Sequence, residues 1–184
     1  KIPTNEDAIL NPRSPYEFSK VLAATFCEYY RSQYEMNVVS VRPANVFGPG
    51  DHSFTRIIPA AMRAIAEGRG IPVQEHAVSM RRDFIYVSDV AQMIYTLATE
   101  PTAHSIYNLS PNASMMILDM AHRITRILSG PDPVLVGKPG AYREIPQQSI
   151  AGSRVVGEFG FDFTPVDTAI METYAAYCAR FGVQ

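Results

Sequence analysis

Residues 14–20 have the sequence Ser-Pro-Tyr-Glu-Phe-Ser-Lys, and they open a predicted helix that continues to about Tyr34. The first serine suits the N-cap, the proline suits the first helical position, and the glutamate completes a capping box. This helix places Tyr16 and Lys20 four residues apart on one face. A nearby cation favours the phenolate form of a tyrosine, so the pair is suited to general acid/base chemistry.

The spacing of Tyr16 and Lys20 is a weak signal by itself. With ten tyrosines and three lysines among 184 residues, roughly one sequence in six of this composition contains such a pair by chance. Its surroundings are more informative, because the predicted helix leads into a β-branched run at residues 38–41, typical of a strand buried in a parallel sheet. An Arg-Pro-Ala-Asn turn follows at residues 42–45. Two interpretations of Tyr16 and Lys20 are open at this point: a catalytic pair, and a helical pair that only faces solvent.

The composition excludes several classes of protein. The chain is 47% hydrophobic, enough for a real core, and its formal charge of −2 argues against general attraction to nucleic acid or to anionic membranes. It contains no apolar run of about 18 residues, so we expect no membrane span. Cys27 and Cys178 are too few for a disulfide framework and favour the cytoplasm. The four histidines have no metal-ligand spacing, so no metal site is expected.

Predicted helices and short strands alternate along the chain, which indicates an α/β protein. Ser88 is expected to cap one of the helices, and Thr164 followed by Pro165 is expected to start the last one. The remaining predicted helices cover residues 57–67, 89–99, 116–128 and 166–180, and the remaining strands cover 71–73, 83–87 and 106–109. Only two or three strands suit a parallel sheet, too few for a free-standing doubly wound fold. We therefore expect a part of the fold to precede this sequence.

Three segments, in this order, resemble landmarks of the extended short-chain dehydrogenase/reductase family, the NAD-dependent epimerases and dehydratases of nucleotide sugars. They are Ser-Pro-Tyr-Glu-Phe-Ser-Lys at 14–20, Val-Arg-Pro-Ala-Asn-Val-Phe-Gly-Pro-Gly at 41–50 and Arg-Asp-Phe-Ile-Tyr-Val-Ser-Asp at 82–89. Tyr-Asn-Leu at 107–109 and the Gly-Phe-Asp-Phe-Thr-Pro ending at 160–165 also fit. The resemblance therefore spans nearly the whole chain.

The resemblance implies the C-terminal part of a Rossmann-type doubly wound sheet together with the small α/β substrate-binding lobe. Residues 1–50 and 82–112 would belong to the NAD-binding lobe. Residues 51–81 and 113–184 would form the lobe that binds the nucleotide sugar. The two lobes would therefore alternate along the chain.

By resemblance, the reactive centre lies at the start of the first helix and the end of the following strand. Tyr16 would be the general acid/base, and Lys20 would hold the nicotinamide ribose while biasing Tyr16. The backbone of Pro43 would border the nicotinamide, unless this proline only ends a strand. The implied cofactor is NAD, with NADP as the alternative.

The implied substrate residues are an asparagine and several arginines. Asn45 would reach the sugar-nucleotide diphosphate, or would be a plain turn residue. Arg82 would clamp a substrate phosphate through its bidentate geometry, with Arg81 as the alternative if the register slips by one residue. Arg143 is a candidate for a second phosphate contact, and a plain surface arginine is an equally open reading of it.

The stretch at residues 50–59 is similar to the corresponding stretch of sugar 4,6-dehydratases, so Arg56 and Ile57 are expected to line the substrate site. Residues 75–80, Glu-His-Ala-Val-Ser-Met, depart from the family's glycine-rich turn and leave the nucleotide-base contacts open. No Gly-x-x-Gly-x-x-Gly motif is present in the sequence. This loop and the family's remaining catalytic residues would lie upstream of Lys1, so we expect a fragment that needs its N-terminal half.

The expected activity of the complete protein is NAD-dependent epimerisation or 4,6-dehydration of a nucleotide-diphosphate sugar, an isomerase or a lyase reaction. Hydride would leave the sugar C4 while Tyr16 removes the hydroxyl proton. Two alternatives are open: a catalytically silent substrate-binding or dimerising module, and an NAD(P)H-dependent carbonyl reductase of the same family. By resemblance, the helix from Tyr16 to Tyr34 would also form a homodimer interface.

Overall fold

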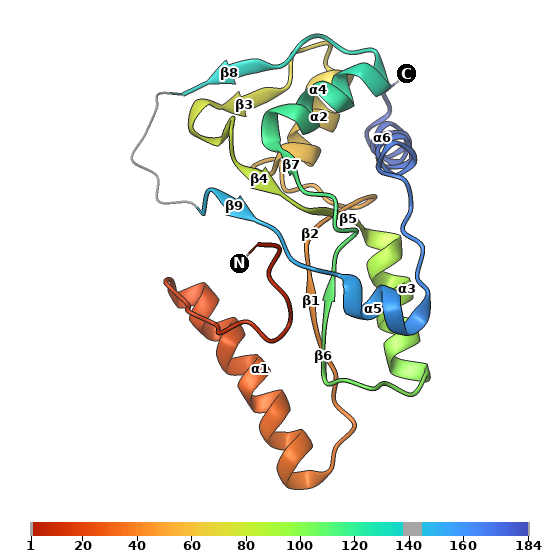
Figure 1. Ribbon diagram of the computed structural model, residues 1–184. Coiled ribbons are helices and arrows are strands. Elements are labelled where there is room, and N and C mark those ends of the chain that lie inside the picture. The colour runs from red at the N-terminus through yellow and green to blue at the C-terminus, as the bar shows by residue number, and fades with distance from the viewer. Residues whose placement is uncertain (1, 138–144, 184) are drawn as a thin grey trace.

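Parallel strand pairs form the framework of the computed structural model, which describes residues 2–137 and 145–183 (Figure 1). The helices are α1 (Pro15–Tyr34), α2 (Ile57–Ala66), α3 (Val87–Thr99), α4 (Ile117–Leu128), α5 (Ser153–Phe159) and α6 (Val166–Phe181). The strands are β1 (Ser40–Pro43), β2 (Asn45–Phe47), β3 (Pro72–Gln74), β4 (Arg81–Arg82), β5 (Phe84–Tyr86), β6 (Ile106–Leu109), β7 (Met115–Met116), β8 (Val134–Val136) and β9 (Gln147–Gln148). The alternation of helices and strands confirms the predicted α/β class.

The strands pair across long stretches of sequence. β1 pairs with β6, β2 with β5 and β3 with β8, all in parallel. β4 has two neighbours, with β9 parallel to it and β7 antiparallel. Parallel neighbours need a crossover connection, and α2 lies in the connection between the paired strands β2 and β5. Strand β2 follows β1 after a single residue, so the site described below lies where the chain passes from one strand pair to the next.

Two hydrophobic clusters lie in different halves of the molecule. The first, which we call the α2 cluster, packs α2, α4 and α6 together, with Met62, Met120 and Ile170 at its centre. The second, the β6 cluster, packs α3 and α5 against β1 and β6 around Met93 and Tyr107. Figure 1 shows α2, α4 and α6 in the upper part of the molecule and α3 and α5 below them. The assignment of chain segments to two lobes stays a prediction.

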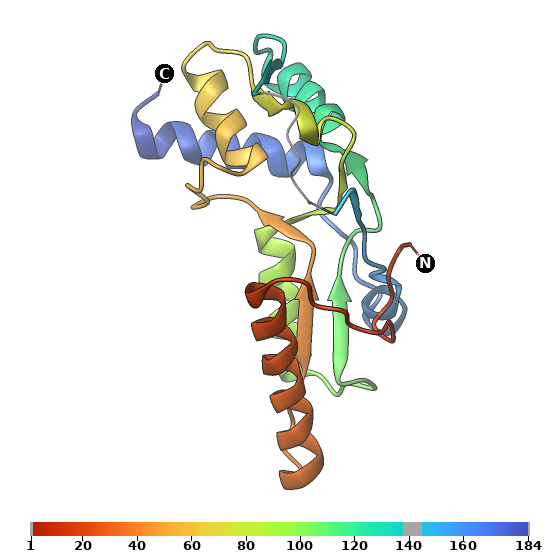
Figure 2. The ribbon, with the colours of Figure 1, turned by 90° about the vertical axis from the view of Figure 1, so that its left-hand side faces the viewer.

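Helix α1 begins as predicted but lies apart from both clusters. The Ser14 hydroxyl accepts from the Glu17 backbone N–H at 3.2 Å, and Glu17 accepts from the Ser14 N–H at 3.2 Å, which confirms the capping box. None of the 20 residues of α1 is buried. In Figure 1, α1 and α3 lie on opposite sides of the β1–β6 pair, and Figure 2 shows α1 extending past the lower ends of these strands. A helix that leaves its large apolar side chains exposed is typical of a helix that is covered in a larger structure.

Both predicted side-chain caps after the first helix are wrong. Helix α3 begins at Val87, directly after β5, so Ser88 lies inside the helix. Helix α6 begins at Val166 with Pro165 at the cap position. Thr164 instead donates its hydroxyl and its N–H to the buried Asp89 carboxylate, at 2.6 and 3.0 Å. A tertiary contact has thus replaced a local cap.

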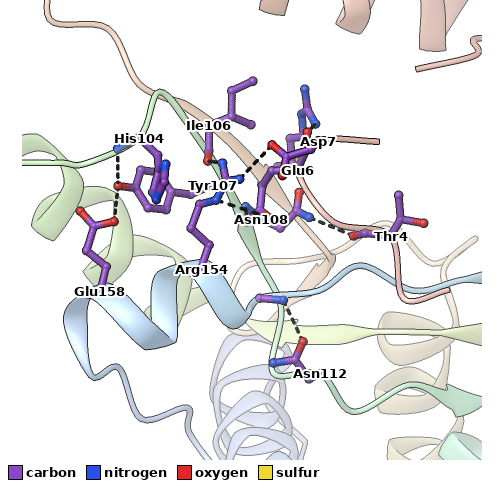
Figure 3. Close-up of polar contacts among 12 residues, drawn as sticks. Thr4, Glu6, Asp7, His104, Ile106, Tyr107, Asn108, Asn112, Arg154 and Glu158 are labelled. Carbon is purple, nitrogen blue, oxygen red and sulfur yellow. Dashed lines mark hydrogen bonds and ion pairs between the residues drawn. The ribbon is translucent and has the colours of Figure 1, made fainter. Parts of the chain in front are cut away.

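The N-terminal segment closes the outer edge of β6 (Figure 3). The Glu6 carboxylate, 6% exposed, accepts from the Asn108 backbone N–H at 3.0 Å. The Asn108 side chain donates to the Thr4 carbonyl at 3.1 Å, and Arg154 forms ion pairs with Asp7 at 3.0 Å and with Glu6 at 3.8 Å. A buried carboxylate requires such donors, so these contacts fix the segment against the sheet.

A buried tyrosine ties α5 to the end of the connection that leads into β6. The Tyr107 hydroxyl donates to Glu158 at 2.7 Å and accepts from the His104 N–H at 3.1 Å (Figure 3). Burial, reinforced by the hydrogen bond to the Glu158 carboxylate, raises the pKa of Tyr107 to about 12. The neutral phenol is therefore the form that belongs to the folded protein.

This pKa predicts a loss of stability at high pH. The unfolded chain releases the Tyr107 proton at about pH 10, whereas the folded chain keeps it to about pH 12. The stability advantage of the wild type over Tyr107→Phe should therefore be constant below pH 10 and should shrink by about 2 kcal/mol as the pH rises through this window. Urea unfolding followed by circular dichroism measures the difference. An advantage that does not change between pH 9 and 12 would contradict the assignment.

Candidate functional site

A cavity of about 490 Å³ lies between β2, β5, the first turn of α2 and the segment from β3 to β4. Four of the predicted substrate residues line it: Asn45, Arg56, Ile57 and Arg82. They come from three elements and the residue before α2, separated by up to 37 positions (82 − 45) in the sequence. The structure thus brings these four residues to one cavity.

The first turn of α2 forms one wall of the cavity. Arg56 occupies the N-cap position with extended backbone, and its side chain makes no capping bond. The first turn of any α-helix leaves N–H groups without intrahelical partners and carries a partial positive charge. Residues 56–60 all line the cavity, so this positive end borders the space inside it. Such a wall favours an anionic ligand.

Asn45 is held in place by one backbone carbonyl. Its backbone N–H and its side-chain Nδ2 both donate to the carbonyl oxygen of Asp83, at 3.1 and 2.9 Å. This fork leaves the carboxamide only one orientation that keeps both bonds. The geometry presents a fixed amide at the cavity wall, and the role of Asn45 in binding a ligand stays a prediction.

The two neighbouring arginines of β4 have different positions. Arg82 lines the cavity and donates from Nη1 to the Arg81 carbonyl at 2.9 Å. Arg81 turns elsewhere and donates from Nη2 to the carbonyl of Ser114 at 2.7 Å. Of the two alternatives for the phosphate arginine, the structure places Arg82 at the cavity.

Asp83 joins the segments that form this site. Its carboxylate, in a residue only 1% exposed, accepts from the Ser110 hydroxyl at 3.1 Å and from the Ile150 N–H at 2.8 Å, both through Oδ2. Its carbonyl accepts the two bonds from Asn45. In the sequence, the spacing of Asp83 only favours Arg82 over Arg81 as the phosphate arginine. No feature of the sequence predicts that Asp83 anchors the site.

The predicted catalytic residues lie elsewhere on the surface. Lys20 Nζ is 5.4 Å from the centre of the Tyr16 ring, and Tyr16 is 70% exposed on α1. Pro43, at the end of β1, is exposed as well. None of these three residues lines the cavity. Arg143 lies outside the residues that the structure describes.

A second cavity of about 400 Å³ shares Phe47 and Phe84 with the first and is lined mainly by apolar residues.

Within residues 2–137 and 145–183, no cluster of three or more His, Cys, Asp or Glu side chains could hold a metal ion. None of the described helices has both the length and the apolar character needed to cross a bilayer.

Comparison with known proteins identifies the family. The profile of the NAD dependent epimerase/dehydratase family matches residues 1–110, so the chain belongs to this family. Among curated proteins, dTDP-D-glucose 4,6-dehydratase of Mus musculus is 27% identical over 124 residues, which are 67% of this chain and 34% of that protein.

Solved structures share the fold. UDP-glucose 4-epimerase of Thermotoga maritima, determined with UDP-glucose, matches with a TM-score of 0.87 at 19% identity, over 97% of this chain and 58% of that one. The dTDP-glucose 4,6-dehydratase of Bacillus anthracis, in complex with NAD, matches with a TM-score of 0.81 at 22% identity, over 94% of this chain and 54% of that one. These likenesses confirm the Rossmann-type α/β fold. The chain spans between a third and three fifths of the length of these proteins.

The bonds of Asp83 generate a prediction on stability. Replacing Asp83 by Ala leaves the buried Ser110 hydroxyl and the half-buried Ile150 N–H without this acceptor, so the free energy of unfolding should fall by about 3 kcal/mol. Hydrogen exchange at the Ile150 amide should accelerate in parallel. Asp132→Ala, at an exposed loop residue, is the matched control and should change the stability by less than about 0.5 kcal/mol. Equal effects of the two substitutions would contradict the anchoring role.

Proposed function

We propose that this chain supplies the diphosphate-binding site and the acid/base pair of an NAD-dependent nucleotide-sugar epimerase or 4,6-dehydratase. The observation that supports it most is the cavity, in which Asn45, Arg56, Ile57 and Arg82 meet at the positive end of α2. A sugar nucleotide carries two negative charges on its diphosphate. Guanidinium groups, a fixed amide and uncapped N–H groups are the donors that such a group requires.

The residues on α1 and β1 fit the nicotinamide end of NAD. The Tyr16 and Lys20 side chains are exposed and adjacent, and the neighbouring strand ends in the exposed Pro43. Lys20 would hold the ribose, and Pro43 would border the nicotinamide. NAD, with NADP as the alternative, would supply the hydride acceptor. The glycine-rich phosphate loop of the family is not among this chain's motifs, so the rest of the cofactor site would come from other sequence.

The chemistry of the chain's own residues is then a proton transfer. Tyr16, held beside the Lys20 ammonium, removes the proton of the sugar C4 hydroxyl and later returns one. Asn45, Arg82 and the first turn of α2 hold the diphosphate and thereby position the sugar. Epimerisation and dehydration share this first step, and the similar proteins include a dTDP-D-glucose 4,6-dehydratase and a dTDP-L-rhamnose 4-epimerase.

We also propose that α1 forms a homodimer interface in the complete protein. Seven large hydrophobic side chains of α1 are exposed, and the periodicity of an α-helix places them along one face of roughly 160°: Tyr16, Phe18, Leu22, Phe26, Tyr29, Tyr30 and Tyr34. Single exposed apolar residues need no explanation, but a contiguous set of this size marks an interaction surface. A silent binding or dimerising module remains the alternative function. Tight binding of NAD by the 184-residue chain alone would argue against that alternative.

Arg82 provides the direct test of the diphosphate site. Replacing Arg82 by Gln should weaken the binding of dTDP-glucose and UDP-glucose by roughly 10- to 50-fold in isothermal titration calorimetry, because a charge-assisted hydrogen bond to the phosphate is lost. Arg126→Gln, at an exposed position of α4, is the matched control and should leave both affinities unchanged. If the Arg82 variant is folded and binds both ligands as the wild type does, the site is assigned wrongly.

The role of Tyr16 is tested in the complete protein with its N-terminal half. Tyr16→Phe should lower kcat by a factor of about 100 or more while the affinity for the nucleotide sugar stays within about twofold, because the phenol acts on the reacting hydroxyl and lies outside the diphosphate site. Tyr95→Phe, at an exposed position of α3, is the control and should keep the wild-type kcat. Unchanged turnover in the Tyr16 variant would rule out the acid/base role.

A further inference from the structure

Asp51 and Arg56 form an ion pair in the wall of the cavity. Arg56 Nη1 lies 2.9 Å from Asp51 Oδ2, and Arg56 Nη2 donates to the Val46 carbonyl. The Asp51 side chain is 16% exposed and that of Arg56 is 46% exposed. The guanidinium is thus held across the cavity wall by a carboxylate and a carbonyl of the same chain.

Asp51 is itself fixed by the loop before α2. Its Oδ1 accepts from the Ser53 N–H at 3.1 Å, and its N–H donates to the Gly48 carbonyl at 3.2 Å. Two of the hydrogen bonds of Asp51 therefore do not involve Arg56. It also borders a smaller cavity of about 230 Å³, so it belongs to the wall between two spaces.

A carboxylate in this place is unfavourable for a site that binds anions. The charged side chains among the described lining residues are Asp51, Arg56 and Arg82, with His76 as a further titratable group. Coulomb attraction at an effective dielectric constant of about 20 amounts to about 2 kcal/mol at 8 Å, so one added or removed charge matters for binding. By pairing with Arg56, Asp51 lowers the positive charge that the cavity offers.

We propose that Asp51 is a specificity residue that limits the negative charge this cavity accepts, an inference that rests on the proposed function. A diphosphate diester such as a nucleotide sugar carries two negative charges, whereas a free nucleoside diphosphate carries about three at pH 8, since the terminal phosphate has a second pKa of about 6. The third charge gains little from the neutralised Arg56 and is repelled by Asp51. The pair thus selects for the sugar-bearing diester over the free nucleotide.

A double-mutant cycle separates this role from a structural one. Asp51→Asn keeps an acceptor for the Ser53 N–H while removing the charge. It should tighten the binding of dTDP-glucose by about 3-fold and that of dTDP by about 10-fold, measured by calorimetry at pH 8. Arg56→Gln leaves Asp51 unpaired and should weaken both ligands by at least about 10-fold. The double variant restores the wild-type net charge and should bind both within about 3-fold of the wild type.

A control variant and two contrasting results separate the role of Asp51 from the proposed function. Glu100→Gln, an equal charge change at the exposed end of α3, should leave both affinities unchanged. If a folded Asp51→Asn binds dTDP-glucose and dTDP no more tightly than the wild type, or tightens both to the same degree, the charge-limiting role of Asp51 is wrong while the proposed function stands. If the folded wild type and all variants bind neither ligand, the proposed function is overturned and this role with it.

Discussion

Asp83 is the buried carboxylate on which the arrangement of the site depends. Its side chain accepts from Ser110, after β6, and from Ile150, after β9, while its carbonyl accepts the fork from Asn45 on β2. Because Asp83 stands between β4 and β5, these bonds join the β1–β6 pair, the β2–β5 pair and the β4 sheet at one residue. A buried carboxylate requires such donors, so the bonds that Asp83 Oδ2 accepts also fix the segments around it, while Oδ1 is buried without a hydrogen-bond partner among the described residues.

The cavity and the predicted acid/base pair depend on different kinds of contact. The cavity is a product of tertiary contacts, since Asn45, Arg56 and Arg82 come together only when β2, β4 and α2 are in place. The Tyr16–Lys20 pair is a local product of one capped helix and needs no other element to form. The two parts lie on different elements, as expected if further structure completes the site between them. The share of its relatives that this chain spans agrees with that view.

Local signals predicted the parts of the structure that local energy determines. The Ser-Pro-Tyr-Glu start of α1 and the β6 run at Ile106–Leu109 are where the sequence places them, since capping and β-branched apolar patterns act within a few residues. The predicted caps of α3 and α6 are wrong. Helix α3 begins before Ser88, and Thr164 bonds the distant Asp89 instead of capping α6. The short strand β2 and helix α5 were not predicted, as their stability comes from packing against other segments rather than from their own pattern. The residues proposed to bind the diphosphate were predicted from the resemblance to the family. The anchoring role of Asp83 is visible only in the structure.

A crystal structure of the chain with dTDP-glucose tests the central claim most directly. The account predicts that the diphosphate occupies the 490 Å³ cavity, with its oxygens within hydrogen-bonding distance of Asn45, Arg82 and the N–H groups at the start of α2. A ligand found instead in the second cavity behind Phe47 and Phe84, or bound on the surface away from these residues, would contradict it.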